Sequence, residues 1–253
     1  MRTFLSPLAA LCLLFASHSL FAESLNVVHS GKWPPYSDVA LPGQGLGVDL
    51  VTTALKRAGY TVYLNTDSWE RNLEGGKLGV YDVVATAWYS DERNQYLDFS
   101  KPYLKTYVRF IKRKDSDFEF NDLGDLKGMM IGVLTDYAYD DAFNQSRDII
   151  KIPERNLIQN LLKLKQGRID LTLDDDRVLR YQINRYMPNS MKDFAILPKP
   201  LAERGIYIGV SRENPHHAKI VADFNKAIEA MKKDGTYDRI LAKHRAYIDK
   251  PAP

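Results

Sequence analysis

The stretch YDVVATAWYSDERNQYLDFSKPY, from Tyr81 to Tyr103, decides the fold. Its first part, Asp82 to Tyr89, is rich in β-branched and aromatic residues and predicts a buried strand, and the polar segment Ser90 to Arg93 predicts the turn that ends it. Ligands of open α/β sheets bind beyond the carboxyl ends of the strands. A strand that delivers hydroxyl groups and an arginine at that end predicts a binding site, and Arg93 is its first candidate residue.

Strands and helices alternate before this stretch. Strands are expected at Leu25 to His29 and at Thr61 to Asn65. Apolar residues between them recur every three or four positions until Gly59, which predicts an amphipathic helix with a glycine C-cap. A short helix is expected from Trp69 to Gly79. The order β-α-β-α-β favours a parallel sheet with helices on its faces.

The same order begins again after Tyr103. Further strands are expected at Tyr107 to Lys112, Met129 to Thr135, Ile169 to Leu173, Phe194 to Leu197 and Gly205 to Ser211. The polar segment Arg113 to Asp125 predicts a crossing between lobes. Two helices are expected at the end of the chain, on either side of Gly235. Two α/β lobes joined by polar crossings are the simplest organisation.

The first residues have the pattern of a secretory signal peptide. Arg2 precedes an apolar run from Leu8 to Phe15, and cleavage is expected after Ala22. The run is too short for a permanent membrane span. Cys12, the only cysteine, lies inside this run and follows Leu11 instead of the small residue that a lipoprotein signal needs. We therefore expect export to the periplasm, without a lipid anchor and without cysteine in the mature protein.

The charge balance of the expected mature chain is nearly neutral. Removal of Arg2 lowers the 35 Lys and Arg to 34, against 32 Asp and Glu, so the net charge is +2. This argues against a nucleic-acid partner, which needs a strongly positive face. No later segment reaches the roughly 20 apolar residues of a membrane helix. A soluble globular protein with one large or two smaller domains follows.

Several short motifs, in order, resemble one family across nearly all of the mature chain. They are Gly47-Val48-Asp49-Leu50, Asp91-Glu92-Arg93, Asp98 to Tyr103, Gly132-Val133-Leu134, Gly167 to Asp170, and Phe224 to Ala227 followed by Asp234 to Tyr237. The chain thus resembles the extracellular solute-binding proteins of family 3, the polar amino-acid binding class. The resemblance implies a two-lobed, type II periplasmic-binding-protein fold. Each lobe is then a mostly parallel sheet flanked by helices, with a hinge between lobe 1 (residues 23–110 and 204–253) and lobe 2 (residues 111–203).

The resemblance also implies a function and its site. A periplasmic protein of this class captures an amino acid or similar small polar solute between its lobes and delivers it to a membrane ABC permease, and we expect it to act as a monomer. Arg93 matches the arginine that pairs with the ligand α-carboxylate, and Asp175 matches the acid that pairs with the α-amino group. Trp33 and Trp69 match positions that line the side-chain pocket.

The chain departs from the family pattern at two places. Trp88 occupies the position of a small hydroxyl residue, which leaves Thr86 and Ser90 nearby. The second lobe has Asp136, Tyr137 and Ala138 where the family has a Gly-Thr-Thr turn. We expect Thr86, Trp88, Tyr137 and Ala138 to contact the ligand and to change which ligand is bound.

Each candidate also has a structural alternative. Arg93 could pair with its neighbouring acids at the surface. The run Asp174-Asp175-Asp176 could be a solvated loop or a cap on the next helix. Trp88 and Tyr89 could be buried packing instead of pocket wall.

No sequence pattern calls for a metal, a cofactor or catalysis. The histidines lack metal-ligand spacing, Gly43 to Gly47 lacks the rest of a dinucleotide-binding loop, and there is no Gly-x-Ser-x-Gly turn. Two alternatives remain. One is an exported enzyme that resembles the cyclohexadienyl dehydratases, with Glu70, Asp136 or Asp175 as its acid. The other is a sensory module that presents the same ligand to a receptor.

Overall fold

The computed structural model describes residues 23–135 and 137–248. The expected signal peptide, residues 1–22, lies outside the described residues and stays a prediction, and Asp136 lies outside them too. The α-helices are α1 Leu46–Arg57, α2 Trp69–Lys77, α3 Asp91–Asn94, α4 Asp141–Gln145, α5 Leu157–Lys165, α6 Asp176–Tyr186, α7 His217–Lys233 and α8 Thr236–Ile248. Short 3₁₀ turns cover Pro42–Gln44, Leu123–Leu126 and Ser190–Asp193.

Most strands belong to one continuous sheet. The strands are β1 Ser24–His29, β2 Lys32–Trp33, β3 Ser37–Asp38, β4 Thr61–Thr66, β5 Val83–Ala87, β6 Leu97–Phe99, β7 Leu104–Arg113, β8 Met130–Leu134, β9 Ile150–Glu154, β10 Leu171–Asp175 and β11 Phe194–Ser211. The sheet has the order β4-β1-β5-β11-β7-β10-β8-β9, with β6 also paired to β11. β2 and β3 form a separate two-stranded ribbon. The sheet thus has a parallel group of strands at each end, as expected from the repeated β-α order.

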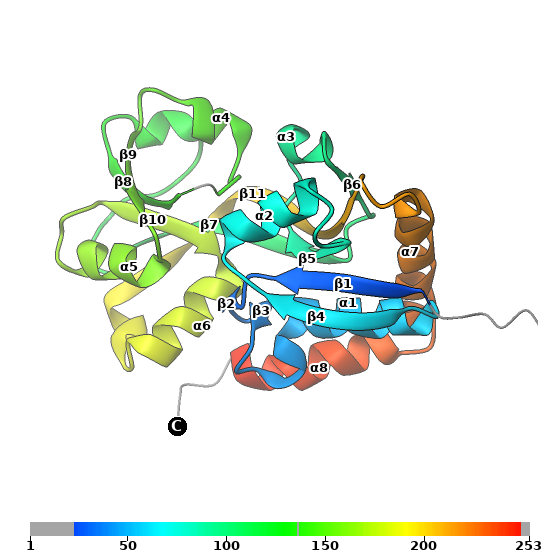
Figure 1. The fold of residues 1–253 in the computed structure, drawn as a ribbon. Coiled ribbons are helices and arrows are strands. Elements are labelled where there is room, and N and C mark those ends of the chain that lie inside the picture. The colour runs from blue at the N-terminus through cyan, green and yellow to red at the C-terminus, as the bar shows by residue number, and fades with distance from the viewer. Residues whose placement is uncertain (1–22, 136, 249–253) are drawn as a thin grey trace, which may run out of the picture.

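The two parallel groups form the two lobes of an α/β structure (Figure 1). Lobe 1 holds β1, β4 and β5 with α1, α2, α7 and α8, and lobe 2 holds β8, β9 and β10 with α4, α5 and α6. The predicted two-lobed fold is therefore confirmed. Among the described residues, no helix is both long and apolar enough to cross a membrane.

Two long antiparallel strands, β7 and β11, connect the lobes. The last residues of β11 pair with β5 and β6 in lobe 1, and its earlier residues pair with β7, which pairs in turn with β10 of lobe 2. The prediction that Arg113 to Asp125 forms a crossing was wrong, because β7 already pairs with β10 of lobe 2 from Val108 to Lys112, before Arg113 is reached. The expected lobe boundaries at 110/111 and 203/204 fall inside these two strands and stay a prediction.

Lobe 1 is built around the buried face of α1. This helix buries Val51, Ala54 and Leu55 at the spacing that the sequence predicted, and Leu50 beside them. Gly47, in its first turn, lies so close to β5 that a Cβ atom there would be 2.7 Å from Cγ2 of Thr86. A glycine at this position therefore allows the helix to approach the strand end that carries the candidate site.

Candidate functional site

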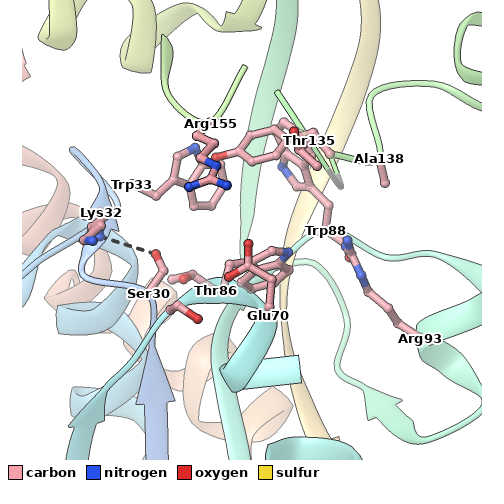
Figure 2. A pocket seen from close by; sticks show the side chains of 13 residues that line it. Ser30, Lys32, Trp33, Glu70, Thr86, Trp88, Arg93, Thr135, Ala138 and Arg155 are labelled. Atoms are coloured by element: carbon pink, nitrogen blue, oxygen red, sulfur yellow. Dashed lines mark hydrogen bonds between the residues drawn. The ribbon is translucent and has the colours of Figure 1, made fainter. Parts of the chain in front are cut away.

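A cavity of about 240 Å³ lies between the lobes (Figure 2). Its walls come from the ends of β1, β5, β8 and β9, from β2 and α3, and from the start of α2. The lining residues are Ser30, Lys32, Trp33, Ser68, Trp69, Glu70, Thr86, Trp88, Arg93, Thr135, Tyr137, Ala138 and Arg155. The site thus lies beyond the carboxyl ends of parallel strands of both lobes, which is where α/β sheets bind ligands.

Arg93 is held on the cavity wall by its local sequence. Ser90 caps α3 by accepting a hydrogen bond from the backbone N–H of Arg93, and Nη1 of Arg93 donates to the carbonyl oxygen of Trp88 at 2.9 Å. The guanidinium lies 5.1 Å from the ring centroid of Trp69. The side chain is mostly buried, with 7% of the residue exposed. The interpretation of Arg93 as a surface partner of neighbouring acids is wrong, because the residue is buried and lines the cavity.

A buried histidine holds the loop that carries Trp33 through hydrogen bonds. His29 ends β1, and its Nδ1 lies 2.9 Å from Oγ of Ser37 while its Nε2 lies 2.7 Å from Oε1 of Gln44. Burial lowers the pKa of His29, and the hydrogen bond to Gln44 opposes this change. A neutral imidazole fits this environment, because it can donate from one ring nitrogen and accept at the other. His29 therefore ties both ends of the loop that forms this side of the cavity.

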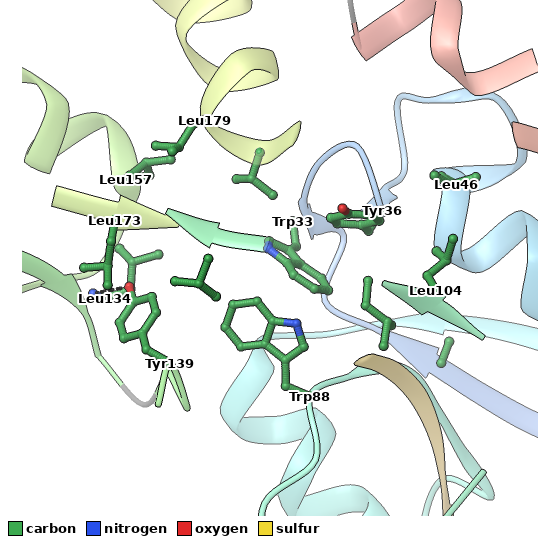
Figure 3. Close-up of a cluster of buried hydrophobic side chains, with 14 of the residues drawn as sticks. Trp33, Tyr36, Leu46, Trp88, Leu104, Leu134, Tyr139, Leu157, Leu173 and Leu179 are labelled. Carbon is green, nitrogen blue, oxygen red and sulfur yellow. Dashed lines mark hydrogen bonds between the residues drawn. The ribbon is translucent and has the colours of Figure 1, made fainter. Parts of the chain in front are cut away.

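Five aromatic rings form a continuous cluster from lobe 1 to lobe 2; Figure 3 shows four of them. We call Trp33, Tyr36, Trp88, Tyr137 and Tyr139 the aromatic cluster. Ring centroids are 4.7 Å apart for Trp33 and Tyr36, 5.4 Å for Trp33 and Trp88, and 5.6 Å for Trp88 and Tyr137. The last two pairs are edge-to-face, a favourable arrangement for aromatic rings. Trp88 is both buried packing and cavity wall, so the two interpretations of this residue hold together.

Asp175 does not line the cavity, and its carboxylate accepts hydrogen bonds from other residues of the protein. Oδ1 accepts from the hydroxyl of Tyr36 at 2.7 Å and from the backbone N–H of Arg177 at 3.0 Å, and Oδ2 accepts from the backbone N–H of Tyr107 at 3.0 Å. The residue is the N-cap of α6 and is 1% exposed. The expectation that Asp175 faces Arg93 across the cleft is not supported by this placement. The alternative, a cap on the next helix, is confirmed.

Asp174 lies next to the aromatic cluster. It is buried in β10, and its Oδ1 accepts from the backbone N–H of Asp175 at 2.7 Å. Burial raises its pKa well above the ordinary value of a carboxyl group, and the N–H of Asp175 and the nearby indole of Trp33 oppose that rise. This rise is expected, because a position beside buried aromatic rings disfavours the charged form of a carboxyl group.

Seven of the eight predicted ligand-binding residues meet at the cavity, and Asp175 is the exception. The cavity also has wall residues that the sequence analysis did not propose as ligand contacts: Ser30, Lys32, Ser68, Glu70, Thr135 and Arg155. Lys32 could have been found beside Trp33. Arg155 could not, because it follows β9, whose sequence IKIPE contains a proline and gave no strand signal.

Glu70 lies at the start of α2. Backbone and Ser68 hydrogen bonds lower the pKa of Glu70, and the charges of Arg155 and Lys32 lower it further. Glu70 is therefore ionised near neutral pH, and it lines the same cavity as the cations Lys32 and Arg155. In the described part of the chain, no group of three or more His, Cys, Asp or Glu residues could hold a metal ion.

Known proteins share this fold and sequence pattern. The ABC transporter arginine-binding protein 1 of Escherichia coli K12 is 24% identical over 237 residues, covering 92% of this chain and 95% of the relative. The lysine/arginine/ornithine-binding periplasmic protein of Escherichia coli K12 is 25% identical over 255 residues, covering 95% and 94%.

Solved structures of periplasmic-binding-protein type have the same fold as this chain. An ancestral arginine-binding protein bound to arginine superposes with a TM-score of 0.72 at 26% identity, covering 87% of this chain and 97% of that one. A histidine kinase sensor domain with similarity to periplasmic binding proteins has a TM-score of 0.75 at 22% identity, covering 88% and 96%, and it shows the fold alone. The sequence pattern of the bacterial extracellular solute-binding proteins, family 3, matches residues 25–246, and this chain therefore belongs to that family.

Proposed function

We infer that this chain captures an amino acid or a similar small polar solute between its lobes and delivers it to an ABC permease from the periplasm. The observation that carries this inference is the position of Arg93, which lines a cavity whose walls come from both lobes. A guanidinium can donate two parallel N–H bonds to a carboxylate, and such charge-assisted bonds are stronger than neutral ones. Relatives of similar length bind arginine, histidine or cystine, which supports an amino-acid-like solute.

Capture depends on contacts that both lobes make at once. Trp69, Thr86 and Arg93 belong to lobe 1, whereas Tyr137 and Arg155 belong to lobe 2. A solute that touches both sets binds the closed form more tightly than the open form and so shifts the population toward closure. A permease that recognises the closed form would then distinguish loaded from empty protein. Bending of β7 and β11 near residues 110/111 and 203/204 is the proposed hinge motion.

Titration calorimetry tests this function directly. Purified mature protein, as a monomer, is titrated with the common amino acids and with small dicarboxylates, beside Arg93→Ala and the control Arg71→Ala. Arg71 is an exposed residue of α2 that does not line the cavity. We expect a dissociation constant near micromolar, about −8.2 kcal/mol, for at least one solute. Equal affinity in the wild type and Arg93→Ala would remove Arg93 from the site.

We propose binding without catalysis. A dehydratase of this fold needs a general acid, and Glu70 is ionised near neutral pH because its pKa is lowered. The carboxylate of Asp175 caps α6 and accepts a hydrogen bond from Tyr36. Formation of product from prephenate or arogenate by the purified protein would overturn this part of the proposal.

A further inference from the structure

The described walls of the cavity carry more positive than negative charge. Lys32, Arg93 and Arg155 are cations, and Glu70 is the acid among the described lining residues. Asp174 and Asp175 do not line the cavity and are both almost fully buried. The described lining residues favour a ligand with more negative than positive charge, and Lys32 and Arg155 disfavour a cationic side chain beside them.

The cations lie toward two ends of the cavity. Figure 2 shows Arg93 on the side of α3, and Lys32 and Arg155 away from it on the side of Trp33. Figure 2 shows Glu70 between the two ends, with its carboxylate on the side of Arg155, and the charges of Arg155 and Lys32 lower its pKa. One acid among the described lining residues offsets only part of the charge of Lys32 and Arg155, so that end keeps a positive charge.

The space between the two ends suits a short carbon chain. Trp33, Trp69 and Trp88 line the cavity with their rings, and the hydroxyls of Ser30, Ser68, Thr86 and Thr135 add hydrogen-bonding groups. Its volume of about 240 Å³ is below the roughly 300 Å³ at which pockets for drug-sized ligands begin. A solute with only a few carbons between its charged groups fits these dimensions.

We propose that the cavity binds a small solute with two carboxylates, an acidic amino acid or a short dicarboxylate, with one carboxylate on Arg93 and the other between Lys32 and Arg155. The proposal rests on the proposed function and narrows its solute class. It sets this chain apart from the relatives named for binding arginine, lysine and ornithine. Those three ligands have cationic side chains, and Lys32 and Arg155 would repel them. Because Lys32 comes from lobe 1 and Arg155 from lobe 2, the second carboxylate would also hold the lobes closed.

Calorimetry with matched solutes tests the proposal. L-Glutamate and L-glutamine have nearly the same shape and differ by one charge, glutarate lacks the amino group, and L-arginine carries the opposite charge. We expect glutamate or glutarate to bind at least about tenfold more tightly than glutamine, and arginine to bind most weakly. Raising the salt concentration should weaken glutamate binding more than glutamine binding, because salt screens charge pairs.

Variants locate the second carboxylate. Lys32→Gln and Arg155→Gln should each reduce the ratio of glutamate to glutamine affinity, and the double variant should reduce it most. Arg147→Gln, an exposed residue of lobe 2 that does not line the cavity, should leave the ratio unchanged. Melting temperatures of all variants are compared with the wild type, so that a folding defect is recognised.

The outcomes separate this proposal from the proposed function. If a neutral or cationic amino acid binds most tightly and its binding needs Arg93, the solute-binding function stands and the two-carboxylate proposal is overturned. The same holds if glutamate binds best but Lys32→Gln and Arg155→Gln leave the affinity ratio unchanged. If no amino acid or dicarboxylate binds the wild-type protein, the proposed function itself fails.

Discussion

The indole of Trp88 packs edge-on against the ring of Tyr137, with ring centroids 5.6 Å apart and planes at 85°. Trp88 follows β5 of lobe 1, and Tyr137 follows β8 of lobe 2. Both residues stand where the resemblance to the family implied smaller ones. The two departures from the family pattern therefore meet each other across the cleft and form a direct contact between the lobes.

Replacing Trp88 by alanine should destabilise the protein and loosen the contact between the lobes. The side chain is buried and touches Trp33, Tyr137 and Tyr139, so Trp88→Ala should cost about 3 to 5 kcal/mol of unfolding free energy. Urea denaturation measures this loss, and small-angle X-ray scattering measures the separation of the lobes. Tyr63→Ala is the matched control, because Tyr63 is 57% exposed on β4. A loss no larger than that of Tyr63→Ala would contradict the packing role.

Replacing Arg93 by lysine separates charge from geometry. Lysine keeps the positive charge but loses the planar pair of donors that a carboxylate accepts. A charge-assisted hydrogen bond is worth about 1.5 to 3 kcal/mol, so Arg93→Lys should weaken solute binding by about ten- to a hundredfold and Arg93→Ala by more. Calorimetry gives both affinities. Full affinity in Arg93→Lys would show that the site reads only charge at this position.

Replacing Asp175 should lower the stability of the fold more than it lowers the affinity for the solute. Asp175→Ala leaves the buried hydroxyl of Tyr36 and the N–H groups of Tyr107 and Arg177 without their acceptor. Loss of an N-cap alone costs about 0.5 to 2 kcal/mol, and the other buried donors add to this. Urea denaturation and calorimetry are compared for Asp175→Ala and Asp175→Asn. Unchanged stability together with lost binding in Asp175→Asn would restore Asp175 as a ligand contact.

His29 should make stability depend on pH. Its pKa is lowered in the folded protein below the value of about 6.5 that an unfolded chain has, so the unfolded state takes up a proton first as the pH falls. The stabilising contribution is complete above about pH 6.5 and is lost as the pH falls through the lower pKa of the folded state.

Urea denaturation between pH 8 and pH 5 checks this dependence. His29→Asn should flatten the part of the profile below pH 6.5, even if it lowers stability throughout. The variant His216→Asn, at an exposed histidine, is the control. A wild-type profile whose slope below pH 6.5 persists in His29→Asn would assign that slope to other groups.

Much of the fold could be predicted from local sequence. The strand at Val83–Ala87 follows from a short run of β-branched and small apolar residues that is buried on both faces. The helix at Leu46–Arg57 follows from an apolar period near 3.6 residues, which depends only on which side chains face the core. β10 was expected at Ile169 to Leu173 and lies two residues later, at Leu171–Asp175. This shift is decided by its pairing with β7, a partner about 60 residues away in the chain.

The sequence by itself determined that Arg93 follows a buried strand, because neighbouring residues are enough to specify a strand end and its turn. The resemblance to the family added that smaller residues were expected at Trp88 and Tyr137. Tertiary structure alone decided the rest of the site. It placed the carboxylate of Asp175 against the hydroxyl of Tyr36 and at the N-terminus of α6. It also brought Lys32 and Arg155 to the same cavity from different lobes. The physical reason is that a charged side chain pairs with the groups that folding brings near it. Those groups come from strands that are far apart in the sequence and pair only in the folded protein.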